Sequence, residues 1–256
     1  VHATVSGTVA AVEPRPHPNG TQVLAVVIEN DFKDEPDPSL HPLSMEAMTP
    51  EQMTEVVKEA GIVGHGGATF PTHVKIQSAI GKVDTLIING AECEPYITSD
   101  HRILLEQTQD VIDGIKILIK ILGVQNGKLA IEENKADVFP VVEKLLPQDG
   151  SIQLCRLKTK YPQGAEKQLI YAITHREVPS GKLPADAGCA VFNVDTAAAI
   201  ACKFKTGMND IRRIVTVSGS AIASPKNLEV RVGTPIGQVI EAAGGFREDP
   251  NKILMG

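Results

Sequence analysis

Strand-like and helix-like segments alternate over about 150 residues in the middle of the chain. Buried-strand patterns occur at 83–89 (VDTLIIN), 128–133 (KLAIEE), 151–155 (SIQLC) and 190–194 (AVFNV). Helical patterns separate or follow them at 101–122, 135–146, 161–174 (after a turn) and from about 196. This alternation predicts an α/β fold with a mostly parallel sheet that helices cover on both faces. Such sheets bind ligands where their strands end.

The flanking segments have a different pattern. Residues 1–30 alternate as two strands around the turn RPHPNG at 15–20, and a hairpin alone is marginally stable. We therefore expect a truncated N-terminal β unit, followed by an acidic, proline-rich linker up to residue 43. Residues 211–256 predict a separate β-β-α module. The predicted parts are 1–43, 44–210 and 211–256, and we interpret the chain as a fragment of a longer protein.

Charge, hydropathy and cysteine spacing argue against several classes of function. The net charge of −6 argues against nucleic acid as a partner, and no apolar run approaches the ~20 residues that span a bilayer. The four cysteines (Cys93, Cys155, Cys189 and Cys202) form no C-x-x-C pair. We therefore expect no metal site within this fragment.

The stretch 61–75, GIVGHGGATFPTHVK, carries Gly64, Gly66 and Gly67 within four positions. Glycines allow a ligand to approach the backbone closely, and Pro71 suits the first position of a helix. The free N–H groups of that first turn and the charge of Lys75 favour an anion. The stretch thus predicts a phosphate cradle, and the alternative is a tight turn between two packed helices.

Polar residues follow the predicted strands. Glu92 and Glu94 come after the strand that ends at Asn89, and on an extended segment their side chains would point the same way. They are either acceptors for a cofactor or ribose, or a solvated acidic turn. Two further turns are expected at the same edge of the sheet, carrying Tyr161, Gly164 and Glu166 in one and Asn193 and Thr196 in the other.

The order of these motifs strongly resembles the C-subunit family of Rnf electron-transport complexes. The resemblance rests on GIVGHGGATFPTHVK, VDTLIINGAECEPYITSDHR, TKYPQGAEKQLI and REVPSGKLPADAG, and it covers nearly the whole chain. The chain is more distantly similar to the flavin-carrying, NADH-oxidising subunit of respiratory complex I. The resemblance implies a barrel-sandwich-like unit, a Rossmann-like FMN/NADH-binding domain and a soluble-ligand-binding β-grasp (SLBB) module.

The resemblance also implies cofactors and site residues. FMN would be the cofactor and NADH the substrate, and the family's [4Fe-4S] cysteines would fall after Gly256. Carried over position by position, the cofactor-binding residues would be Gly64, Gly66, Gly67, Lys75, Asn89, Glu92, Glu94, Tyr161, Gly164, Glu166, Asn193 and Thr196. No side chain need act as acid or base, because the hydride would pass directly from NADH to the flavin.

Four positions near these residues need comment. Thr69 replaces a glycine of the complex I pattern, and because β-branched residues disfavour positive φ, we expect an ordinary backbone there or a reshaped loop. His65 replaces an arginine, which is expected to weaken phosphate binding at neutral pH. Ala165 replaces an acidic residue. Phe70 is expected either to stack on the nucleotide or to lie in the core.

The resemblance implies an NADH-oxidising subunit of an ion-translocating ferredoxin:NAD complex, peripheral on the cytoplasmic face of the membrane and bound to the other Rnf-type subunits. The excised fragment need not be active itself. One alternative is a non-catalytic docking subunit with a degenerate flavin site. Another is a relative of the cobalamin reductases of bacterial microcompartments.

Overall fold

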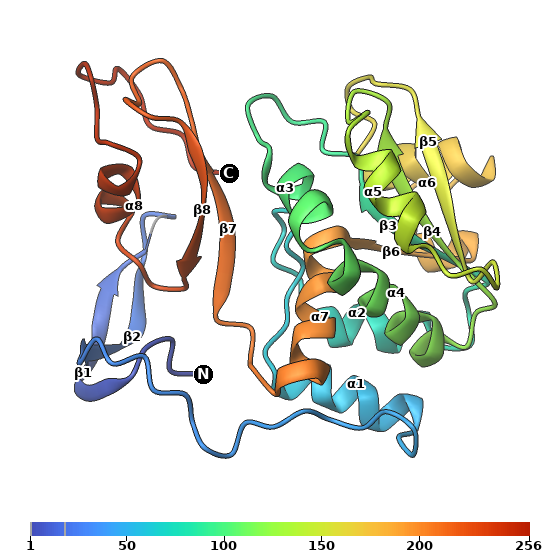
Figure 1. Ribbon diagram of the computed structural model, residues 1–256, viewed down its shortest axis with the longest axis horizontal. Coiled ribbons are helices and arrows are strands. Elements are labelled where there is room, and N and C mark those ends of the chain that lie inside the picture. The colour runs from blue at the N-terminus through green and yellow to red at the C-terminus, as the bar shows by residue number, and fades with distance from the viewer. Residues whose placement is uncertain (1, 18) are drawn as a thin grey trace.

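The computed structural model describes residues 2–17 and 19–256 and has an α/β domain with two small β modules on one side of it (Figure 1). The strands are β1 (Gly7–Pro16), β2 (Gln22–Asn30), β3 (Thr85–Gly90), β4 (Gly127–Glu132), β5 (Ile152–Leu157), β6 (Cys189–Asn193), β7 (Arg212–Val217) and β8 (Lys226–Arg231). The α-helices are α1 (Pro50–Glu59), α2 (Thr72–Ala79), α3 (Ser99–Glu106), α4 (Thr108–Leu122), α5 (Val138–Leu145), α6 (Glu166–Thr174), α7 (Val194–Thr206) and α8 (Ile236–Ala242).

The central sheet has the strand order β5-β4-β3-β6, and every pairing in it is parallel. The prediction of a mostly parallel sheet is therefore confirmed. The chain builds outward from β3 through β4 to β5 and then returns to place β6 on the other side of β3. The strand order thus reverses between β3 and β6, and a crevice at the ends of these strands is where such sheets bind ligands.

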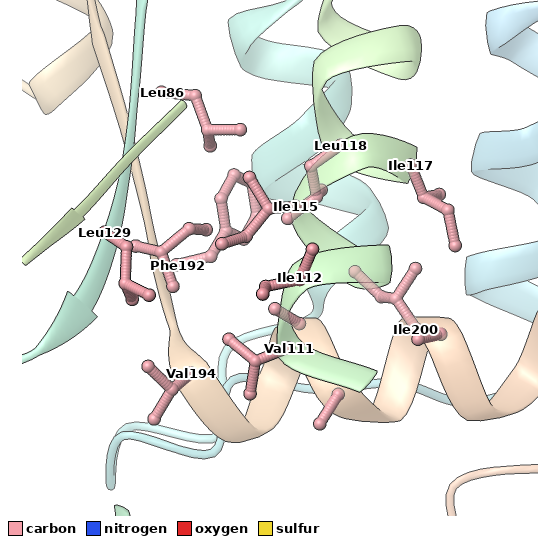
Figure 2. Close-up of a cluster of buried hydrophobic side chains, with 14 of the residues drawn as sticks. Leu86, Val111, Ile112, Ile115, Ile117, Leu118, Leu129, Phe192, Val194 and Ile200 are labelled. Atoms are coloured by element: carbon pink, nitrogen blue, oxygen red, sulfur yellow. The ribbon is translucent and has the colours of Figure 1, made fainter. Parts of the chain in front are cut away.

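The core lies mainly on one face of this sheet (Figure 2). Side chains of α4 such as Ile112 and Ile115 pack toward Leu86, Leu129 and Phe192 of three adjacent strands. Helix α6 contributes Leu169 and Ile170 to a smaller cluster with residues of the other face. Both faces are covered, as the alternating pattern predicted.

Helix α1 begins with the capping box that its sequence indicates. Thr49 Oγ1 accepts from the N–H of Gln52, and the Gln52 side chain accepts from the N–H of Thr49. By contrast, the expected helix over 101–122 is two helices, because the chain breaks at Gln107 (φ −124°) between α3 and α4. The hydrophobic period continues across that break, so periodicity alone did not reveal it.

The flanking modules are both two-stranded. Strands β1 and β2 pair antiparallel, as predicted, although residue 18 of the predicted 15–20 turn lies outside the described residues. Strands β7 and β8 also pair antiparallel and pack with α8 around Val217, Ile222 and Ala243. The two modules lie side by side in Figure 1, and Arg231 joins them through the Thr4 carbonyl oxygen at 2.9 Å. In the described part of the chain, every helix is too short or too polar to cross a membrane.

Candidate functional site

Two asparagines mark the point between β3 and β6 where the strand order reverses, which is where sheets of this kind have their ligand-binding crevice. Asn89 and Asn193 are register partners at the ends of these strands. Asn89 Nδ2 donates to the Gly164 carbonyl oxygen at 2.9 Å, which attaches the 161–166 turn to the end of β3. A Cβ on Gly164 would lie 2.2 Å from the Ala91 carbonyl oxygen, so this turn needs glycine for its close approach.

The glycine stretch forms a closed loop over the same edge. Val63 and Pro71 form an antiparallel bridge, and the Gly64 N–H donates to the Phe70 carbonyl oxygen at 2.8 Å. A Cβ on Gly66 would lie 3.5 Å from Asn193 Cβ, so the loop tip contacts the end of β6. The four predicted turns therefore meet at one place.

The cradle differs in detail from the predicted one. Pro71 precedes α2 rather than opening it, and the Thr72 N–H donates to the Ile62 carbonyl oxygen, because the bridge below the loop uses that amide. Thr69 takes φ +49°, so the expectation of an ordinary backbone is wrong. This left-handed conformation costs a β-branched residue roughly 1–2 kcal/mol, and the closed loop imposes it. Phe70 is 52% exposed, which excludes the core alternative.

Lys75 crosses from α2 to the start of α6. Its Nζ donates to Glu166 Oε1 at 2.7 Å and to the Val191 carbonyl oxygen at 2.7 Å. It also lies 5.6 Å from the centre of the Phe192 ring. About a third of the Lys75 side chain is exposed, so the amine is held beside the crevice and remains accessible.

Glu92 and Glu94 point in different directions, and the expectation that they point together is wrong. The strand ends at Gly90 and the chain bends at Glu94, so the alternation of an extended chain does not apply. Glu92 is 4% exposed and accepts from the N–H groups of Asp100 and His101 at the start of α3. Glu94 is exposed, and its negative charge raises the pKa of the neighbouring Tyr161.

His65 is buried and turned away from the loop tip. Its Nδ1 lies 2.8 Å from Asp195 Oδ2, and its Nε2 lies 3.0 Å from Asp210 Oδ2. Burial lowers the pKa of His65, but hydrogen bonds and charges from both carboxylates outweigh burial and raise it to about 9. The ring is therefore charged at neutral pH. If His65 weakens phosphate binding relative to the arginine of the complex I pattern, loss of its positive charge is not the reason.

Sequence reasoning missed the acidic residues behind the crevice. Asp100 Oδ2 accepts from Asn193 Nδ2 at 2.7 Å. Burial, followed by the charge of Glu92, raises the pKa of Asp100 to about 8. Asp195 and Asp210 were missed as well. Isolated aspartates carry no pattern of their own, and the usable signals were the position of Asp195 just after a buried strand and that of Asp100 in the polar segment that follows another.

The crevice suits a phosphate-bearing ligand with hydroxyl or amide groups. Within the described residues, the N–H groups of Gly66, Gly67 and Ala68 donate to no protein acceptor, and a Cβ on Gly67 would meet open space. Consecutive free amides of this kind bind anions. Glu132 Oε2 and Gln163 Oε1 are buried acceptors without a donor. The loop-tip amides therefore fit the phosphate group of a nucleotide such as FMN.

Comparison with protein families gives three matches that together span most of the chain. Residues 57–202 match the Nuo51 FMN-binding domain, residues 214–253 match the SLBB domain, and residues 1–33 match the RnfC barrel sandwich hybrid domain. Solved structures of an NAD+-reducing [NiFe]-hydrogenase, H2-reduced and air-oxidised, match 76% of this chain and 39% of theirs. Their TM-scores are 0.66 and 0.67 at 23% and 24% identity, which shows the fold alone. The expected fold class is confirmed.

Several relatives match the whole chain. The C subunit of the Na(+)-translocating ferredoxin:NAD(+) oxidoreductase complex of Acetobacterium woodii is 49% identical over 100% of this chain and 58% of its own length. The C subunit of the proton-translocating ferredoxin:NAD(+) oxidoreductase complex of Clostridium ljungdahlii is 45% identical over 100% of this chain and 56% of its own. The C subunit of the ion-translocating oxidoreductase complex of Rhodobacter capsulatus is 42% identical over 100% of this chain and 50% of its own length. The chain thus spans about half the length of these curated relatives.

Proposed function

Because the chain belongs to the Nuo51 FMN-binding domain family and, by the relatives that match its whole length, to the C-subunit family of these complexes, we propose that it binds FMN and oxidises NADH in an ion-translocating oxidoreductase. One observation carries the proposal. Three turns and the glycine loop, all distant in sequence, meet at the strand-order reversal between β3 and β6, and the tip of the loop has free amides. Bound FMN would supply the hydride and single-electron chemistry.

The residues of this chain would bind the flavin and the nucleotide and orient them. The amides at the loop tip and the Lys75 amine suit the flavin phosphate, while Asn89 and Gly164 fix the opposite wall of the crevice. Glu94 and Tyr161 are exposed at its rim and suit the polar edge of a nucleotide. Glu92 supports the site from behind, because its carboxylate is already occupied by the start of α3.

The relatives are named as subunits of ion-translocating complexes, which supports a proposal about where the whole protein lies. We propose that it lies on the cytoplasmic face of the membrane, where NADH is available, and is held there by the other subunits of the complex. Electrons would leave one at a time through [4Fe-4S] clusters outside the described residues.

One set of contacts favours the docking alternative, in which the flavin site is degenerate. Lys75 is already paired with Glu166, Glu92 is buried, and Thr69 holds a strained backbone at the loop tip. A subunit that joined its partners without flavin would keep all three features. Titration with FMN separates the two functions, because a degenerate site would not bind it.

The test is FMN titration followed by flavin fluorescence, on the parent chain and on Gly66→Ala. A Cβ on Gly66 makes only an ordinary 3.5 Å contact with Asn193, so the variant should fold normally. If the phosphate approaches this backbone, we expect at least about tenfold weaker binding, which is about 1.4 kcal/mol. Glu94→Gln, an exposed change, should weaken binding less.

Gly237→Ala is the matched control, because it lies in α8 with open space around the added Cβ. It should bind FMN as the parent does. An absence of FMN binding by the parent, measured up to high micromolar FMN, would favour the docking subunit. Equal affinity for the parent and Gly66→Ala would overturn the placement of the flavin under the loop.

A further inference from the structure

The glycine loop is fastened by a side chain that the proposed binding does not use. The imidazole of His65 is 4% exposed, and each of its ring nitrogens faces a different carboxylate, Asp195 at 2.8 Å and Asp210 at 3.0 Å. Neutral imidazole carries a proton on one nitrogen only. The Asp210 contact has hydrogen-bond geometry, whereas the Asp195 contact is a close ion pair without it, and both contacts are fully attractive only when the ring is charged. We call His65, Asp195 and Asp210 the His65 clasp.

The clasp joins three parts of the chain. Asp195 lies in the first turn of α7, while Asp210 lies between α7 and β7 and receives Arg213 Nη1 at 2.5 Å. The loop backbone is attached to the same elements, since the His65 N–H donates to Thr196 Oγ1 at 3.0 Å and the Val63 N–H to Asp210 Oδ2 at 3.4 Å. The base of the loop is therefore tied both to the nucleotide domain and to the strand that begins the β-grasp module.

We propose that His65 is a positioning residue: its doubly paired imidazolium holds the 64–69 loop against α7, so that the loop-tip amides stand ready for the phosphate of a bound nucleotide. The identity of that nucleotide rests on the proposed function. The clasp itself is a property of the ligand-free chain. The clasp gives Asp195 and Asp210 a role, although neither is among the expected cofactor-binding residues.

The clasp should depend on pH. The pKa of His65 is raised from 6.5 to about 9, so its contribution is complete below 6.5 and is lost as pH rises through 9. The titratable and charged groups around the ring are, besides its two partners, Asp100 and the cavity-lining residues Cys202, Arg212, Arg213 and Glu229. Both arginines are already paired, Arg212 with Glu229 and Arg213 with Asp210.

Loop mobility can be followed directly, because the chain contains no tryptophan. Phe70→Trp places one at an exposed position of the loop. In this background, fluorescence anisotropy should be high and constant from pH 6 to 8 and should fall with a midpoint near 9. Adding His65→Gln should give the low value at every pH. Adding Asp210→Asn should move the midpoint toward 6.5, which a purely structural effect would not do.

His101→Gln is the control, because His101 also contacts a carboxylate, Asp137 at 3.0 Å, but lies on α3 away from the loop. The anisotropy of this control should depend on pH as that of the parent does. FMN affinity, measured without the tryptophan, should fall at least about tenfold in His65→Gln at neutral pH. The proposed clasp would be overturned by unchanged anisotropy in His65→Gln or by an unshifted midpoint in Asp210→Asn. If His65→Gln fails to fold, the midpoint of Asp210→Asn alone decides the question. A parent that binds no FMN would refute the proposed function alone, since the anisotropy is measured without ligand.

Discussion

A buried carboxyl group stands behind the crevice with an amide as its hydrogen-bond donor. Asp100 accepts from Asn193, and the nearby Glu92 adds negative charge. Burial and that charge raise the pKa of Asp100 from 3.8 to about 8, so the folded chain holds a proton that the unfolded chain loses. Stability therefore falls as pH rises from about 4 to about 8 and is constant above that range.

We predict that Asp100→Asn makes the chain more stable at pH 8, on the order of 2 kcal/mol, because an amide fills the same space without a charge. The gain should vanish near pH 4, where aspartate is protonated in both states. Urea unfolding at pH 4, 6 and 8 measures it. A variant that is less stable than the parent at pH 8 would show that Asp100 is ionised and paired.

Single residues also show where the sequence is uninformative. Gly66 and Gly164 could be singled out because glycine has few other reasons to occur in such turns, and Gly164 lies where two backbones approach closely. His65 could not, because its role depends on Asp195 and Asp210, which lie about 130 and 145 positions further along. Only the fold brings these three residues together. The assignment of the twelve expected site residues as cofactor ligands stays a prediction.

Among the elements, helices α4 and α7 of the α/β domain cross in close backbone contact. A Cβ on Gly114 of α4 would lie 1.9 Å from the Ala197 carbonyl oxygen of α7. Glycine inside a helix costs about 1 kcal/mol relative to alanine, so its presence in the middle of α4 needs a packing reason, and this contact supplies it. Asn193, the last residue of β6, is also the N-cap of α7, so the crossing fixes the end of β6 at the crevice.

We predict that Gly114→Ala destabilises the chain by about 2 kcal/mol, because the cost of forcing two helices apart exceeds the gain in helix propensity. Thermal or urea unfolding measures this effect. Lys116→Ala, an exposed change on the same helix, should stay within about 0.5 kcal/mol of the parent. Equal stability of Gly114→Ala and Lys116→Ala would mean that the helices can separate freely.

The order and type of the central elements could be predicted because buried strands and amphipathic helices have different periods. Strands β3 to β6 were all expected within a few residues of their observed bounds. The order β5-β4-β3-β6 could not be derived from the pattern, because the return of β6 to the side of β3 is a long-range pairing. The turn after β3 was also misjudged, since no glycine or proline between Gly90 and Glu94 signals that the extended strand ends before the two glutamates.

At the scale of the whole molecule, the β-grasp module is hydrogen-bonded to the loop that carries the site carboxylates. Asn227 of β8 donates from Nδ2 to Thr98 Oγ1 at 2.9 Å and to the Thr98 carbonyl oxygen at 3.3 Å. Its Oδ1 accepts from Thr216 Oγ1 of β7 at 2.6 Å, and Thr216 Oγ1 accepts from the Thr98 N–H at 3.1 Å. Thr98 immediately precedes α3, so this network fixes the end of the segment that bears Glu92 and Glu94.

We predict that Asn227→Ala loosens the 94–98 segment, because the truncation leaves Thr98 and Thr216 without their common partner. Amide hydrogen exchange around residue 98 should be faster by about tenfold, corresponding to about 1.4 kcal/mol, while exchange in β3 and β4 should stay unchanged. FMN affinity should fall with it, because Glu94 lies on the loosened segment. Asn251→Ala, an exposed change in the same module, should leave both measurements unchanged. Faster exchange throughout the central sheet would show instead that the module supports the whole α/β domain rather than this one segment.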